Sequence, residues 1–384
     1  MSTPIYLDHN ATTPLDPAAL AAMRPILEER FGNPSSDHVL GRAAREALAV
    51  ARAQVAGLLG CAADEVVFTS GGTESNNLAL IGAVAARGRD GGHLVTSRIE
   101  HPSVLAACRH LEQRWGCRVT YLPVDGSGRV DPGDVERALT ADTHVVSVMH
   151  ANNETGVLQP VAEIGEIAAR HGAVLHTDAA QSAGKVPVHL TALGAGLLTL
   201  AGHKLYGPKG VGALAVRAGV ELRAVLHGAG QEGGLRPGTE NVAGIAGLGA
   251  ACAHAAALLA PEGRRLTALR DRLWLALEAA GWLLNGHSAE RLPNTLNVSL
   301  EGVDGAEVLA RAPDVAASTG SACHAGRTEP SAVLLAMGLS ERRAMGAVRL
   351  SLGRSTTEED VDRAAAALVA AGEAARRGSP AGAR

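Results

Sequence analysis

Residues 65–88 have the sequence EVVFTSGGTESNNLALIGAVAARG and contain the unit from which the fold is predicted. The run EVVFTS is short and rich in β-branched residues, as in a strand, whereas ESNNLALIGAVAARG has helical periodicity and ends at a glycine. The same alternation continues along the chain. Further strands are predicted at HLVTS, CRVTYL, THVVSVMH and AVLHTD, residues 93–97, 117–122, 143–150 and 173–178. Alternating strands and helices predict a mostly parallel sheet with helices on both faces.

The pattern changes near residue 255. Two long helical stretches rich in alanine and leucine, at about 241–258 and 262–280, precede a strand at NTLNVSL, residues 294–300. We therefore expect a large domain over residues 15–258. A smaller domain is expected from residues 1–14 together with 259–384.

The composition argues against several classes of function. The 384 residues are 46% hydrophobic and 19% charged, and the net charge of −4 gives no general attraction to nucleic acid or anionic membranes. The five cysteines form no CxxC pair, so neither a zinc or other metal site nor a redox dithiol is expected. The N-terminus lacks the signal-peptide pattern, and no uninterrupted apolar run reaches membrane-spanning length. We expect a cytoplasmic protein whose thiols are free.

Polar residues gather directly after the predicted strands, where ligand sites of open parallel sheets lie. After the first strand, a glycine pair and Thr73 begin a helix. Free N–H groups at a helix start, with a hydroxyl beside them, suit a phosphate; alternatively, the threonine only caps the helix. The segment GAGQEG at 228–233 matches the dinucleotide-binding pattern GxGxxG. Because GLRPGTEN follows it instead of a helix, that interpretation is rejected.

Two later turns carry an acid and an amine. A buried Asp178 at the end of AVLHTD needs a cationic partner, either a protonated pyridine nitrogen or an arginine of the chain. Lys204, in the tight turn AGHKLYGPKG, could condense with an aldehyde if it is partly desolvated, or it could be an ordinary exposed lysine. A phosphate cradle, an acid and an amine at strand ends are what pyridoxal phosphate requires. His101 in EHPS could then lie over the cofactor ring and move protons, or it could cap a helix.

One cysteine has unusual neighbours. The segment SACHAG, residues 321–326, puts Cys323 among very small side chains. Structural cysteines usually pack among large apolar residues. We therefore expect Cys323 in a mobile, accessible loop, as a reactive thiol or as a plain surface thiol.

These motifs resemble those of the NifS/IscS-like cysteine desulfurases, class V of the fold-type I pyridoxal-phosphate enzymes. The resemblance implies a large domain with a mostly parallel seven-stranded sheet flanked by helices, and a smaller α+β domain. It implies a transferase that takes sulfur from L-cysteine, leaves L-alanine and holds a persulfide for an acceptor protein. The matching segments are YLDHNATTPLDP, FGNPSS, FTSGGTESNNLAL, EHPSVL, MHANNETGVLQP, HTDAAQSAGK, GHKLYGPKG, RPGTEN, STGSAC and RLSLGRSTTEED.

The resemblance also implies roles for individual residues. Lys204 is similar to the Schiff-base lysine, Asp178 to the partner of the pyridine nitrogen, His101 to the stacking histidine and Cys323 to the sulfur nucleophile. Thr239 is similar to a residue that reaches the phosphate of the other subunit, which implies a homodimer. The other implied cofactor contacts are Gly72, Thr73, Asn153, Gln181, Ala201, Gly202 and His203, and the implied substrate-carboxylate site is Asn33 with Arg354.

Some features differ from the family pattern or leave alternatives open. Ala201 stands where many members carry a serine, so one phosphate contact is absent. Several segments are also similar to selenocysteine lyases, which makes selenocysteine the alternative substrate, although the long spacing from Cys323 to EPS favours cysteine. An aminotransferase, which has no use for Cys323, and a cofactor-binding sulfur carrier are further hypotheses. The sulfur acceptor is left open between iron–sulfur cluster assembly, tRNA thiolation and another biosynthesis.

Overall fold

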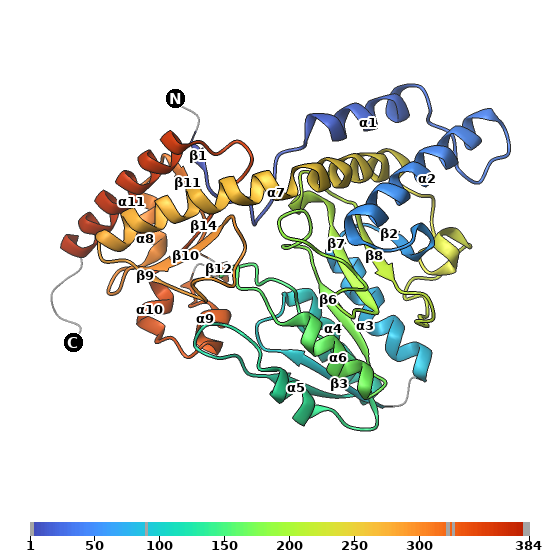
Figure 1. Cartoon of the computed structure of the whole chain (residues 1–384), viewed down its shortest axis with the longest axis horizontal. Helices are drawn as coiled ribbons and strands as arrows, with labels where there is room; N and C mark the ends of the chain where they lie inside the picture. The colour runs from blue at the N-terminus through green and yellow to red at the C-terminus, as the bar shows by residue number, and fades with distance from the viewer. Residues whose placement is uncertain (1–3, 89–90, 320–322, 325–326, 379–384) are drawn as a thin grey trace.

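A seven-stranded sheet lies at the centre of the larger of two regions of the molecule (Figure 1). The computed structural model describes residues 4–88, 91–319, 323–324 and 327–378. The strand order is β2-β8-β7-β6-β5-β3-β4; β8 is antiparallel to both of its neighbours, and all other neighbouring strands are parallel. The predicted mostly parallel seven-stranded sheet is confirmed. Its strands are β2 (Val66–Thr69), β3 (His93–Ser97), β4 (Arg118–Leu122), β5 (Thr143–Ser147), β6 (Val174–Asp178), β7 (Leu197–Ala201) and β8 (Gly212–Val216).

Strands β7 and β8 were not identified from the local sequence pattern. Every residue of β7 is buried, and β8 is buried except for Val216 at its end. Strands buried on both faces lack the alternation of apolar and polar residues that marks a half-exposed strand. These two strands therefore show only as short apolar runs in the sequence.

Helices cover both faces of this sheet, and successive side chains of a strand enter opposite cores. Val67 packs with α3 (Gly72–Arg87) and α4 (Pro102–Trp115) on one face. Val66 and Phe68 pack on the other face, with α2 (Val39–Leu59), α6 (Val161–Arg170) and the first half of α7 (Val242–Ala279). The short helix α5 (Pro132–Ala138) packs against α6.

A second core surrounds a small antiparallel sheet in the order β14-β10-β9, formed by β9 (Leu283–Leu284), β10 (Thr295–Ser299) and β14 (Ala347–Ser351). Helices α8 (Gly305–Arg311) and α11 (Glu358–Gly378) and the second half of α7 supply its other apolar side chains. The N-terminal strand β1 (Ile5–Tyr6) joins this region by pairing with β11 (Val315–Ala316). The domain division at residues 258/259 stays a prediction.

Helix α7 extends through both cores (Figure 1). The sequence predicted two helices with a break near residue 260, which is wrong: α7 is continuous, with Pro261 in its interior. Proline removes one hydrogen bond and bends a helix without ending it when packing holds both halves. By length and composition alone α7 could cross a membrane. Its buried side chains, however, pack in the two protein cores, as in a core helix.

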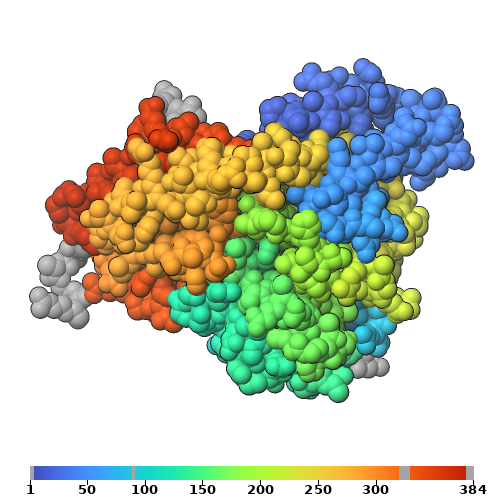
Figure 2. Space-filling model, in the orientation of Figure 1, coloured from blue at the N-terminus to red at the C-terminus, as the bar shows by residue number. Residues whose placement is uncertain are grey.

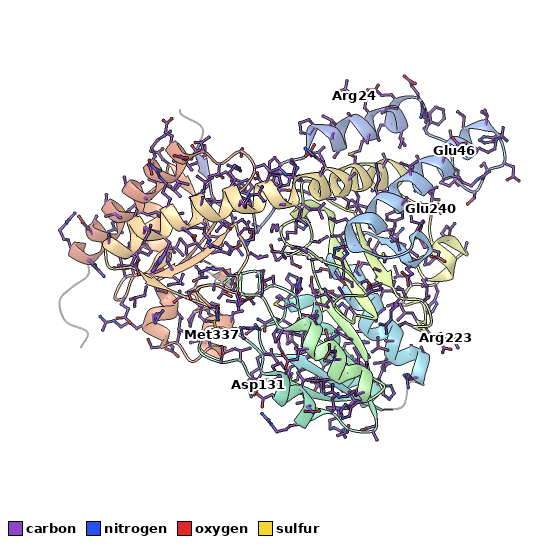
Figure 3. The ribbon with its side chains drawn as sticks, viewed as in Figure 1. Arg24, Glu46, Asp131, Arg223, Glu240 and Met337 are labelled. Atoms are coloured by element: carbon purple, nitrogen blue, oxygen red, sulfur yellow. The ribbon has the colours of Figure 1, made fainter. Side chains whose placement is uncertain are left out.

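Cys323 lies in a short hairpin of the C-terminal region. Strand β12 (Cys323–His324) pairs with β13 (Arg327–Thr328), followed by α9 (Ala332–Ala336) and α10 (Glu341–Met345). The expected mobility of this loop concerns residues 320–322 and 325–326, which lie outside the described residues. Met337, at the end of α9 and labelled in Figure 3, packs in a small cluster with Ile99 from the turn after β3.

Helix α1 (Pro17–Glu28), the following loop and the start of α2 extend outward from the sheet (Figures 1 and 2). Arg24 and Glu46 point away from the molecule on this extension (Figure 3). Large apolar side chains are exposed here as well: Leu27 is 62% exposed, Phe31 71% and Val39 67%. Exposed apolar side chains of this size are typical of an interaction site, so this extension is a candidate for one.

Candidate active site

A cavity of about 240 Å³ lies at the carboxyl ends of strands β6 and β7. Parallel strands end at the same edge of a sheet, so the turns that follow them meet there. Nine of the residues singled out in the sequence line this cavity: Gly72, Thr73, His101, Asn153, Asp178, Gln181, Ala201, His203 and Lys204. Gly202 lies next to them in the short 3-10 turn η2 (Gly202–Lys204).

Lys204 presents its amine to backbone oxygens of the N-terminal segment. Its Nζ donates to the carbonyl oxygens of Asn10 at 2.5 Å and of Ala11 at 2.9 Å. Burial, followed by repulsion from Arg349, lowers the pKa of Lys204 to about 8, and the negative charges of Asp178 and Asp8 oppose the shift. About a tenth of this amine is therefore unprotonated at pH 7, and that fraction is able to act as a nucleophile.

Asp178 is 6% exposed at the end of β6 and faces the cavity. Its Oδ2 accepts a hydrogen bond of 2.7 Å from Asn76 Nδ2, and its Oδ1 accepts one of 2.9 Å from the backbone N–H of Ala180. The sequence left open whether an arginine neutralises this acid. Within the described residues Asp178 forms no ion pair, so a cation in the cavity could take that place.

Asn76 is a site residue that the sequence analysis missed. It lies one turn after Thr73 on α3, and its Nδ2 also donates to Ser103 Oγ at 2.9 Å. Its Oδ1 is buried without a partner in the described part of the chain. Helical spacing was the available signal, because residues three apart share a helix face.

His101 caps a helix, which is one of the two roles that its sequence context suggested, and it also lines the cavity. Its Nδ1 accepts a hydrogen bond from the backbone N–H of Ser103, which caps α4, while the ring lines the cavity. Burial lowers the pKa of His101, with attraction from Asp178 opposing this and repulsion from Lys204 adding to it. The ring is therefore neutral near pH 7, and its Nε2 carries the proton because Nδ1 accepts.

The first turn of α3 forms the other end of the cavity. No side chain caps this helix at Gly71, and Thr73 is exposed at the opening. A side chain at position 72 would meet the Ala201 methyl group at 3.3 Å, so Gly72 keeps the backbone accessible. Nearby, burial lowers the pKa of His203 to about 4, so this imidazole is neutral. The uncapped N–H groups and the Thr73 hydroxyl are donors that suit an anion.

Arg349 of β14 lines the same cavity and was missed in the sequence. It is 7% exposed; its Nη2 donates to Asp8 Oδ1 at 2.7 Å and its Nη1 to the carbonyl oxygen of Asn153 at 3.1 Å. Its Nε is buried without a partner among the described residues. The guanidinium therefore keeps one donor free beside Lys204.

Arg354, which the sequence analysis selected, does not line this cavity. Its Nη1 donates to Asp16 Oδ2 at 2.5 Å, and its guanidinium lies 4.1 Å from the ring centre of Tyr206. It borders a separate, smaller cavity that Lys204 also reaches. Because its charge is already paired with Asp16, Arg354 is not brought to the other site residues, and its expected contact with the substrate carboxylate stays a prediction.

Asn33 and Thr239 lie away from the cavity of their own chain. Asn33 is exposed between α1 and α2, where its Oδ1 accepts a hydrogen bond from the backbone N–H of Ser35. Thr239 is exposed just before α7. The role expected for Thr239 is in a partner subunit and stays a prediction, whereas Asn33 is not brought to the substrate in one chain.

The backbone of Cys323 pairs with that of Thr328, and its side chain is outside the described residues. The other four cysteines are poor nucleophiles. Burial raises the pKa of Cys61 and of Cys108 to about 12, and it raises the pKa of Cys117 and Cys252 as well. None of these four thiols ionises readily at neutral pH.

Comparison with known proteins supplies independent information. The family model of class-V aminotransferases matches residues 5–364. The chain is 46% identical over 366 residues to cysteine desulfurase IscS of Dictyoglomus turgidum, which covers 94% of this chain and 93% of that protein. It is 49% identical over 369 residues to cysteine desulfurase IscS of Anaeromyxobacter dehalogenans, with 95% and 91% covered.

Solved structures are similar over nearly the whole chain. A NifS-like protein superposes with a TM-score of 0.90 at 35% identity, covering 96% of this chain and 99% of its own. A structure of SspA in complex with cysteine gives a TM-score of 0.81 at 38% identity, covering 90% and 98%.

Proposed function

The chain belongs to the class-V aminotransferases and is a cysteine desulfurase, and from that premise we propose which of its residues hold the cofactor, the substrate and the sulfur. Cysteine desulfurases take sulfur from L-cysteine and leave L-alanine. One observation carries the assignment: an amine, an unpaired carboxylate and an anion-binding turn face the same cavity, from Lys204, Asp178 and the first turn of α3.

The residues fit pyridoxal phosphate, the cofactor of this enzyme family. Lys204 would bond its aldehyde carbon, the charge of Asp178 would pair with its ring nitrogen, and Thr73 with the N–H groups of α3 would bind its phosphate beside His203. When bound, the cofactor supplies an electron sink that stabilises negative charge on the substrate. Further contacts are assigned to Asn153 and Gln181 at the ring substituents, and to Gly72, Ala201 and Gly202 along the phosphate end.

We assign the substrate carboxylate to Arg349. Its free Nε and its neighbouring Nη form the planar pair of donors that suits a carboxylate. Asp8 accepts a hydrogen bond from Nη2 of Arg349 and holds the guanidinium in place. A positive charge there also supports the lowered pKa of Lys204, which must give up its proton to react.

Protons and sulfur move between residues of this chain and the substrate. Lys204, once free, takes the proton from the α-carbon, and the neutral His101 donates through its Nε2. The Cys323 thiolate attacks the Sγ atom of the substrate, so that an S–S bond forms and the Cβ–Sγ bond breaks. The electron pair of the broken bond stays on the carbon skeleton, which is protonated and leaves as alanine. The sulfur remains as a persulfide on Cys323 until an acceptor protein takes it.

The exposed apolar side chains of the α1–α2 extension support a homodimer. Leu27, Phe31 and Val39 are all more than half exposed, which is costly for an isolated chain. Thr239 is exposed as well and would reach the phosphate of the other subunit's cofactor. A second copy of the chain that covers the α1–α2 extension and Thr239 would explain both the exposed apolar side chains and the exposed threonine.

The remaining assignments concern substrate and partners. Cysteine is the substrate, and selenocysteine is tested as the alternative by comparing turnover of the two amino acids. A cytoplasmic location is proposed, with no contact to nucleic acid or membrane, and the sulfur acceptor is a scaffold or carrier protein.

The decisive experiment is a visible absorption spectrum of the purified protein with and without L-cysteine, followed by assay of alanine and sulfide. We expect a yellow protein whose band changes on addition of cysteine, with alanine and sulfide formed in equal amounts when a reductant is present. The band should be lost in Lys204→Ala. A protein that stays colourless after incubation with pyridoxal phosphate would overturn the cofactor assignment.

A further inference from the structure

Lysine is rare in this chain. Of its 35 lysine and arginine residues only three are lysines, at positions 185, 204 and 209. Lys204 is assigned above and Lys209 is exposed, which leaves Lys185 as an enclosed amine without a role. Arginine cannot release its proton, whereas lysine is a compact amine that can. Because almost all basic residues of this chain are arginines, the lysine at position 185 indicates that a compact amine able to release its proton is needed there.

Lys185 contacts only uncharged oxygens. Its Nζ donates to Gln181 Oε1 at 3.1 Å and to Asn10 Oδ1 at 3.4 Å. Burial, followed by repulsion from Lys204 and Arg349, lowers its pKa to about 7. The other titratable or charged groups around it are His9, His203, Glu262 and Arg354.

These contacts determine how Gln181 is oriented. In its charged form Lys185 has three donors and no acceptor, so Gln181 then turns its oxygen toward this amine. Its Nε2 then points the other way and donates to the carbonyl oxygen of Asn10 at 3.0 Å, the same oxygen that Lys204 contacts. Gln181 lines the cofactor cavity, whereas Lys185 borders the adjoining cavity of about 30 Å³. Lys185 therefore reaches the site through Gln181.

We propose that Lys185 is a positioning residue that fixes the amide of Gln181, so that its N–H rather than its carbonyl oxygen is offered to the phenolic oxygen of pyridoxal phosphate. This inference rests on the proposed function. A donor to a charged oxygen favours its charged form, whereas a rotated amide would bring an acceptor against it. Loss of Lys185 therefore raises the pH at which the visible band of the bound cofactor titrates.

The test compares holoenzymes carrying Lys185→Met, Gln181→Met and both substitutions. Methionine keeps the length of the lysine chain but has no donor. We expect Lys185→Met to raise the pH midpoint of the visible band by about one unit, the size expected for one hydrogen bond. Gln181→Met should raise this midpoint by a similar amount, and the midpoint of the double variant should be no higher than that of Gln181→Met. Lys209→Met, which removes an exposed lysine of the same region, is the matched control and leaves the midpoint unchanged.

An unchanged midpoint in Lys185→Met, or equal and additive shifts in the double variant, would overturn the proposal, because the lysine would then act by charge alone or not at all.

If Lys185→Met does not fold, the apoenzyme labelled with ¹⁵N at the lysine side chains provides a second measurement. The spectrum of this apoenzyme should contain three Nζ signals, one for each lysine. The signal that is lost in Lys209→Met belongs to Lys209, the signal that is lost in Lys204→Ala belongs to Lys204, and the remaining one belongs to Lys185. Gln181→Met should change the titration midpoint of the Lys185 signal, and an unchanged midpoint would refute the contact. A wild-type protein without any visible band would instead refute the proposed function.

Discussion

Arg349 and Arg354 lie five residues apart in the segment RLSLGRSTT, yet their guanidinium groups pair with different aspartates on different sides of Lys204. Arg349 lines the cofactor cavity and pairs with Asp8, and its buried Nε has no hydrogen-bond partner in the described part of the chain. Arg354 pairs with Asp16, which also caps α1, and lies over Tyr206. We propose that the first binds the substrate, whereas the second connects α1 to the C-terminal region.

Substitution should separate these two roles. Arg349→Ala removes a charged partner of the substrate carboxylate, so we expect kcat/KM for cysteine to fall about 10- to 100-fold, mainly through KM. Arg354→Ala should instead lower the free energy of unfolding by about 2–3 kcal/mol, through loss of the ion pair and the contact with Tyr206. Steady-state rates and urea unfolding of both variants are the measurements. If KM rises in Arg354→Ala and not in Arg349→Ala, Arg354 is the residue that binds the substrate carboxylate, as the sequence predicted.

Cys323 should be the only cysteine needed for sulfur transfer. Cys323→Ala is expected to keep the visible band and its response to cysteine, while persulfide and sulfide formation fall to background. Cys61→Ala is the control, because that thiol is half-buried with a pKa raised to about 12 and should be dispensable. Mass spectrometry of the protein after one turnover detects the added sulfur. Undiminished sulfide release by Cys323→Ala would remove this residue from the mechanism.

Glu100 makes the stability of the protein depend on pH. Its Oε1 accepts hydrogen bonds from Ser97 Oγ and the N–H of Met149, its Oε2 is buried without a described partner, and burial raises its pKa from 4.5 to about 8. Between pH 4.5 and 8 the folded protein holds a proton here that the unfolded chain releases. This contribution to stability is therefore full below pH 4.5 and is lost as pH rises toward 8, by about 1 kcal/mol per unit.

Glu100→Gln keeps an acceptor for both hydrogen bonds and has no proton to release. We expect this variant to be more stable than the wild type at pH 8 and to lose less stability between pH 5 and 8. Thermal unfolding across this range measures the difference. Glu46→Gln, at an exposed position of α2, is the control; a wild-type profile parallel to that of Glu100→Gln would count against a buried neutral Glu100.

The dimer should depend on the α1–α2 extension. Phe31→Asp places a charge on a side chain that is 71% exposed in the single chain, so we expect the dimer to dissociate at least 10-fold more readily. Leu275→Asp is the matched control, because Leu275 is 63% exposed on α7 but lies away from this extension. Light scattering during gel filtration gives the molecular mass of each variant. Dissociation by Leu275→Asp alone would place the interface elsewhere.

Residues that directly follow strands could be predicted well. Thr73, Asp178 and Lys204 each follow an apolar run, and parallel topology brings such positions to one edge of a sheet. Arg349 and Asn76 were missed because each lies in the body of a strand or helix and not at its end, and there side-chain direction decides what a residue contacts. The continuity of α7 past Pro261 was missed for a related reason, since packing on two cores outweighs the local preference of proline.

The sequence by itself determined the alternation of strands and helices from residue 65 to residue 178 and the set of reactive groups that the chain can offer. Both follow from local periodicity and residue type. Only the tertiary structure decided which of two arginines faces the cavity, and which of three lysines contacts Gln181. Those outcomes depend on desolvation and pairing with atoms hundreds of residues away, such as Asp8 with Arg349 and Asn10 with Lys204, and no local pattern encodes such encounters.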